Sequence, residues 1–209
     1  MSARLLATFC LVFGCVSASA ESELVVYLKA DPAQPSGPLS FMKKELTTLM
    51  HAAGYRVEWG GESHSDDLVV VELNGNCSLP AGYERPSAPS AAPAAFASTN
   101  VTDGQVLPFA SVNCATITRS LSTTLWKEAG AQRDFFYGRA LARVIAHELY
   151  HILMRSTDHS RNGVTRRCFS NAELMADRFE FEGPALAQLR ARPQTPATAA
   201  ADSEDATDR

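Results

Sequence analysis

The sequence lacks a long apolar segment beyond residue 20, and it lacks any cluster of basic residues. A helix that crosses a bilayer needs about 20 consecutive, mostly apolar residues. The formal net charge is -4, and the scattered lysines and arginines give no electrostatic footprint for nucleic acid. These absences argue against a membrane-spanning protein and against a nucleic-acid-binding one.

The first residues have the pattern of an export signal. After a short, positively charged start, residues 5–16 form an apolar run, and residues 18–20 have the small-x-small form of a cleavage site. We therefore expect residues 1–20 to be removed and the protein to be exported, as a secreted or periplasmic protein. The alternative is a lipoprotein anchor at Cys15, which we favour less.

Cysteine is scarce in the mature part of the chain. Beyond the signal, the cysteines are Cys77, Cys114 and Cys168. An exported protein resides in an oxidising compartment, where disulfides persist. Cys77 follows one strand-like run and Cys114 ends another, so we predict a Cys77–Cys114 disulfide with Cys168 free. No two of the three have the short spacing of a cysteine zinc site.

The hydrophobic pattern predicts one mixed domain over residues 21–192. Strands are predicted over residues 24–28, 55–59, 68–73, 95–101 and 106–112, and helices over residues 39–50 and 115–126. The order of these elements predicts an α+β fold with an α/β-like sheet at its N-terminal end. Proline, alanine and serine predict a surface loop at 79–94, and composition predicts a disordered tail at 193–209.

A long helix near the middle of the sequence is the most informative segment. It is predicted over residues 134–155, with Asp134 as its N-cap. Apolar residues occupy most of its circumference, a pattern typical of a buried, central helix. His147 and His151 lie on one face of this helix and are therefore predicted to point into the protein.

Residues 147–151 read His-Glu-Leu-Tyr-His, the HExxH pattern. Residues i and i+4 lie one above the other on a helix, so His147 and His151 can bind one ion. Glu148 can then accept a proton from a water that zinc has acidified, and pass it to the leaving amine. Without a metal, three such buried groups would carry a polar burial cost.

This motif resembles that of the zincin metallopeptidases. The resemblance implies a zincin-like domain, a zinc ion as cofactor and a peptide or protein as substrate. It is firm for residues 147–151 only, because Met154 and Thr157 stand where the longer metzincin motif has a glycine and a third histidine. The region is also similar to a group of small exported bacterial proteins that share the His-Glu-Leu-Tyr-His string, a likeness that supplies no substrate.

Two residues are candidates for the third zinc ligand, since a catalytic zinc usually has three protein ligands and one open position. We favour His159, because the polar loop before it can turn the chain back towards the metal. Glu173 is the alternative: with Asp177 it resembles the ExxxD pattern through which thermolysin-like enzymes supply a glutamate ligand. However, residues 170–173 also match a capping box, which gives Glu173 a structural role.

The predicted function is hydrolysis of peptide bonds through a zinc-activated water, with Glu148 as general base. Tyr150, Arg166 and Arg167 are candidates for stabilising an oxyanion. However, Tyr150 is expected to face away from the metal and the arginines to be solvated. Two alternatives stay open: a non-catalytic zinc-binding module on the same scaffold, and a zinc amidase that acts on cell-wall material.

Overall fold

The structure, a computed structural model, describes residues 21–60, 67–80 and 95–192. Its five strands form one mixed sheet in the order β2-β1-β3-β5-β4. The strands are β1 (Ser22–Lys29), β2 (Tyr55–Trp59), β3 (Leu68–Asn74), β4 (Ala97–Thr102) and β5 (Gln105–Asn113). Neighbouring strands run parallel except β4, which is antiparallel to β5 at one edge. The predicted signal, tail and most of the predicted 79–94 loop lie outside the described residues.

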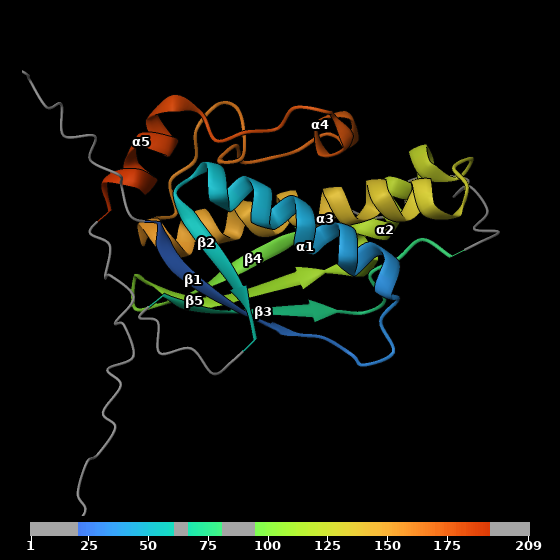
Figure 1. Ribbon diagram of the computed structural model, residues 1–209, viewed down its shortest axis with the longest axis horizontal. Helices are drawn as coiled ribbons and strands as arrows, with labels where there is room; N and C mark the ends of the chain where they lie inside the picture. Colours follow the sequence, from blue (N-terminus) through green and yellow to red (C-terminus); the bar gives the residue numbers. More distant parts are fainter. Residues whose placement is uncertain (1–20, 61–66, 81–94, 193–209) are drawn as a thin grey trace, which may run out of the picture.

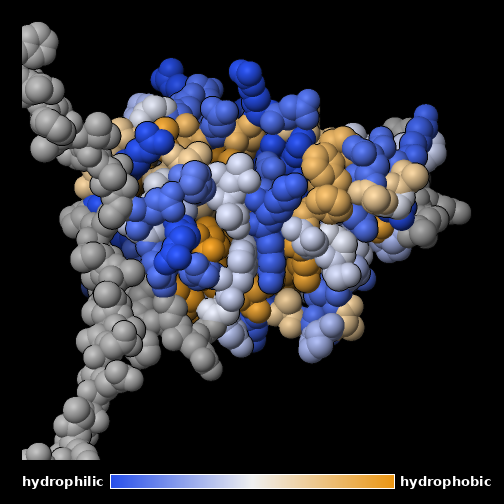
Figure 2. Space-filling model, viewed as in Figure 1, coloured by the Kyte–Doolittle hydropathy of each residue, from blue (hydrophilic) through white to orange (hydrophobic). Residues whose placement is uncertain are grey.

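The helices gather on one face of this sheet (Figure 1). They are α1 (Ser36–Ala52), α2 (Cys114–Leu125), α3 (Gly130–Met154), α4 (Asn171–Met175) and α5 (Gly183–Ala191). The architecture is a single α+β domain, as the sequence predicts. Hydrophilic side chains cover much of the face in Figure 2, with hydrophobic residues visible between them. Within the described ranges, no helix combines the length and hydropathy that a bilayer crossing requires.

Helix α3 is the central helix, and its C-terminal half is buried. Every residue from Ala140 to Leu153 is buried, including the polar side chains of Arg143, His147, Glu148 and His151. An apolar stripe that nearly encircles a helix is buried only where other elements cover it on several sides. Here α1 and the sheet supply that cover (Figure 1).

The predicted start of this helix is wrong. Helix α3 begins at Gly130, and Ala129 is its N-cap without a side-chain hydrogen bond. Asp134 lies inside the helix, and its side chain packs against Gly37 in the first turn of α1. A carboxylate is favoured there because the first N–H groups of a helix are unpaired. Asp134 therefore lies beside the start of α1 and not at the start of its own helix.

The predicted disulfide is present. Cys77 and Cys114 are bonded to one another, and both are fully buried. The bond joins the segment after β3 to the first residue of α2. Cys168 is free and exposed, also as predicted.

Gly138 sets the close approach of α1 and α3. A Cβ built on Gly138 would lie 2.7 Å from Phe41 Cβ and 2.9 Å from the Met42 nitrogen. We expect Gly138→Ala to lower the free energy of unfolding by about 1–3 kcal/mol, because overpacking outweighs the better helix propensity of alanine. Urea unfolding measures this.

The matched control is Gly130→Ala in the same helix, where a Cβ has nothing within 4 Å. That change is expected to leave stability equal or slightly higher. Equal stability of the two variants would contradict the tight packing of α1 on α3 at Gly138.

Candidate metal centre

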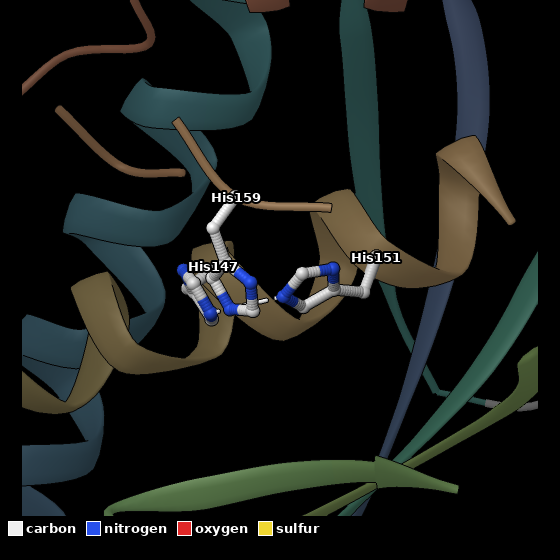
Figure 3. Close-up of side chains that lie close together, drawn as sticks. All are labelled: His147, His151 and His159. Carbon is white, nitrogen blue, oxygen red and sulfur yellow. Dashed lines mark hydrogen bonds between the residues drawn. The ribbon is translucent and has the colours of Figure 1, made fainter. Parts of the chain in front are cut away.

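Three histidines converge at the C-terminal end of α3 (Figure 3). One ring nitrogen each of His147, His151 and His159 lies within 4.8 Å of the others. His147 and His151 come from α3, and His159 comes from the loop that follows. Arg155 ends the helix in the left-handed conformation, with φ 48°, and its N–H bonds to carbonyls of the last turn. This C-cap reverses the chain and brings His159 back over the helix.

The hydrogen bonds of His147 and His151 define the protonation of each ring. His147 Nδ1 lies 2.8 Å from the Val164 carbonyl oxygen, and His151 Nδ1 lies 2.8 Å from that of Ser156. A carbonyl oxygen only accepts, so both Nδ1 atoms must carry the hydrogen. The two Nε2 atoms, 3.0 Å apart, then face each other with lone pairs. Such a pair of acceptors is repulsive unless a proton or a metal ion lies between them.

A bridging proton is disfavoured by the surroundings of these rings. Burial, together with the nearby His151 and His159, lowers the pKa of His147 to about 4, although the hydrogen bond with the Val164 carbonyl opposes this shift. Burial also lowers the pKa of His159, with His151 and Arg167 adding to the effect. At neutral pH the His147 and His159 imidazoles are therefore neutral, which is the form that binds metals. The group can hold a metal ion.

Glu148 is buried next to the histidine cluster. Its side chain lines the same cavity, and the Thr99 hydroxyl donates a 2.6 Å hydrogen bond to its Oε2 atom. Burial raises the pKa of Glu148, and the hydrogen bond from Thr99 opposes that rise. The carboxyl group is therefore a stronger proton acceptor than an exposed glutamate.

The other candidate ligand, Glu173, is placed elsewhere. Its carboxylate accepts from the Ser170 backbone N–H at 2.8 Å, which completes a capping box at the start of α4. It also pairs with Arg166. Asp177, the second member of the ExxxD pattern, is exposed and pairs with Arg139 at 3.2 Å. The structure thus brings His159, and not Glu173, to the two helix histidines.

The Tyr150 ring lies 5.9 Å from the His151 ring, but its hydroxyl points away from the cluster, as predicted. Tyr150 faces α5, where its hydroxyl donates to Gln188 Oε1 at 3.2 Å.

A cavity of about 570 Å³ opens on the histidine cluster. Its lining includes the edge strand β4 with flanking residues, and the segment Arg167–Phe169. The lining is largely apolar and includes Phe96, Val101, Val106, Val144 and Phe169. The Phe169 ring also packs edge-on against His147, with ring centroids 5.3 Å apart. The cavity therefore offers an apolar space beside a polar, metal-binding end.

Thr99, Val164 and Phe169 are the site residues that sequence reasoning missed. Thr99 lies far from the His-Glu-Leu-Tyr-His string in the sequence. Val164 and Phe169 follow the string and share in its likeness to small exported bacterial proteins, but that likeness gave them no role in the site. A strand was predicted over residues 95–101, but its position beside α3 depends on the strand order of the sheet.

No protein-family model matches the chain, and no curated protein matches it. The assignment of the site therefore depends on its own residues and their geometry.

Proposed function

We propose that this chain is a zinc-dependent peptidase with a zincin-type site. His147, His151 and His159 hold the zinc ion, and Glu148 is the general base. The observation that carries the proposal is the pair of Nε2 atoms that face each other 3.0 Å apart, while both Nδ1 atoms point at backbone carbonyl oxygens. Supporting it, the neighbouring glutamate is buried and hydrogen-bonded in the same cavity.

The donor set favours zinc over harder cations. Three neutral imidazole nitrogens are borderline-soft ligands, whereas magnesium and calcium prefer oxygen. The carbonyls of Val164 and Ser156 orient two of the rings, as the partners of zinc-binding histidines do. Three protein ligands leave a coordination position open, which is typical of catalytic zinc.

In the proposed mechanism, Glu148 carries the proton during peptide hydrolysis. Zinc, when bound, supplies Lewis-acid polarisation and lowers the pKa of a water to about 7. Glu148 accepts a proton from the water as the water oxygen forms a bond to the carbonyl carbon, and the C=O electron pair moves onto oxygen. Glu148 then delivers the proton to the amide nitrogen as the C–N bond breaks. The products are a carboxylic acid and an amine, the acid then gives its proton to the amine or to solvent, and Glu148 is regenerated.

The edge strand supports a peptide as the substrate. Among the described strands, β4 pairs with β5 alone, so its other edge has free N–H and C=O groups. An extended peptide can add to such an edge as a further strand. Because β4 also lines the cavity, a peptide bound in this way would place its carbonyls beside Glu148.

Removing the hydroxyl of Thr99 tests the role of its hydrogen bond to Glu148. Thr99→Val is expected to raise the pKa of Glu148, since that bond lowers it. The base must be deprotonated, so activity is lost as pH falls through this pKa, and the acid limb of the pH–rate profile moves to higher pH. The control is Thr102→Val, an exposed position on β4. An unmoved acid limb in Thr99→Val would contradict the assignment of Glu148 as base.

A hydrolysis panel tests the proposed function itself. The purified protein is incubated with denatured proteins and, in parallel, with cell-wall fragments. Cleavage of denatured protein that stops with a chelator and returns with zinc is the expected result. Cleavage of wall fragments alone would favour an amidase, and zinc binding without any hydrolysis would favour a non-catalytic module.

A further inference from the structure

Arg167 contributes a positive charge to the wall of the cavity. Its side chain lines the cavity together with the three histidines and Glu148. It has no carboxylate partner in the part of the chain that the structure describes. Its charge contributes to the lowered pKa of His159, so the guanidinium lies within electrostatic reach of the metal ligands.

The backbone on both sides of Arg167 is anchored. On one side, Arg166 pairs with Glu173 outside the cavity. On the other side, the Phe169 ring packs against His147 and lies 5.5 Å from the Phe179 ring. These contacts hold Arg167 at the cavity wall, while its own side chain stays exposed and free to bind a ligand.

The charges around the cavity favour an anion next to Arg167. Glu148 is the one carboxylate among the lining residues of this cavity, and it is bonded to Thr99 on the β4 side. Arg167 is the one arginine or lysine in the lining. A negative charge that develops on a substrate in this cavity can therefore meet a guanidinium, and a guanidinium binds oxyanions through paired N–H donors.

We propose that Arg167 is a catalytic residue that stabilises the oxyanion during hydrolysis. Its guanidinium donates hydrogen bonds to the carbonyl oxygen of the scissile bond as the C=O electron pair moves onto that oxygen. The same pair returns to re-form C=O when the C–N bond breaks, and the proton path through Glu148 is unchanged. This inference rests on the proposed function.

Ligand binding tests the inference without hydrolysis. The probes are acetohydroxamate, which binds a metal as an anion through oxygen, and imidazole, which binds as a neutral molecule. Calorimetry on zinc-loaded protein compares wild type, Arg167→Gln and Arg161→Gln. Arg161 is the control, an exposed arginine of the same loop that is not among the cavity residues.

We expect Arg167→Gln to weaken the binding of acetohydroxamate by about 10- to 100-fold, since a charged hydrogen bond is lost. Imidazole affinity should stay unchanged.

Peptide kinetics supply the second readout. Removal of one oxyanion donor is expected to lower kcat by about 100- to 1,000-fold with little change in KM. A raised KM with unchanged kcat would overturn the inference, because it is the behaviour of a group that binds substrate and transition state equally.

The outcomes separate this inference from the proposed function. Zinc-loaded Arg167→Gln with wild-type acetohydroxamate affinity overturns the role of Arg167 and leaves the peptidase proposal standing. Wild-type protein that folds but binds no zinc overturns both.

Discussion

Replacing Glu148 with glutamine is expected to lower kcat by about 100- to 10,000-fold while zinc remains bound. Glutamine keeps the size of the side chain and can still meet the Thr99 hydroxyl, but it cannot accept the proton of the attacking water. The three histidines are unchanged, so the metal content should equal that of wild type. Steady-state peptide kinetics and metal analysis on the same preparation measure both quantities.

The matched control for this variant is Glu180→Gln, the same substitution at an exposed glutamate outside the cavity. It is expected to retain full activity. Wild-type activity in Glu148→Gln would contradict the assignment of the base. Loss of zinc from Glu148→Gln would instead show that the carboxylate supports the metal directly.

Arg143→Ala is expected to have the largest effect on stability. The Arg143 guanidinium is 1% exposed, bonds Glu45 at 3.0 Å and donates to the Glu173 carbonyl oxygen at 2.9 Å. It also lies over the Phe179 ring, at 4.8 Å. Truncation leaves Glu45 and the Glu173 carbonyl without this partner and removes packing. Together these losses lower the free energy of unfolding by about 3 kcal/mol. This destabilisation is at the low end for a buried ion pair because Glu45 is 23% exposed.

Urea unfolding of Arg143→Ala against Arg56→Ala measures this cost. Arg56 also pairs with glutamates, but its side chain is 57% exposed, so its removal should cost about 1 kcal/mol or less. Equal costs for the two variants would mean that Arg143 does not hold the α4 segment against α3.

Local patterns were enough to predict the elements that build the site. The alternation of Tyr55–Trp59 and the nearly continuous apolar run of β3 identified strands, and the encircling apolar pattern of α3 identified a buried helix. The boundary at Asp134 was wrong because a good N-cap residue can also serve a neighbouring helix. Here Asp134 lies against the first turn of α1, a contact between distant segments that no local pattern records.

Within the site, helical spacing predicted the residues that share one helix. The residues that distant segments bring to the site could not be predicted in this way. His147 and His151 share a face because of helical geometry alone. His159 reaches the same point only because Arg155 turns the chain in the left-handed conformation, a state that is unusual for arginine. Thr99 and Arg167 line the same cavity through the packing of β4 and of the segment after His159, and neither residue belongs to a motif. The capping-box alternative for Glu173, in contrast, was readable from Ser170 and Glu173 together.

The most direct test of the central claim is the zinc content of the purified wild-type chain and of three variants, His147→Ala, His159→Ala and Glu173→Ala, with folding checked by circular dichroism. We expect one tightly bound zinc per chain in wild type and in Glu173→Ala, and its loss from both histidine variants. Folded wild-type protein without zinc at neutral pH would contradict the metal site and the peptidase proposal with it. Loss of zinc from Glu173→Ala, with retention in His159→Ala, would contradict the third ligand.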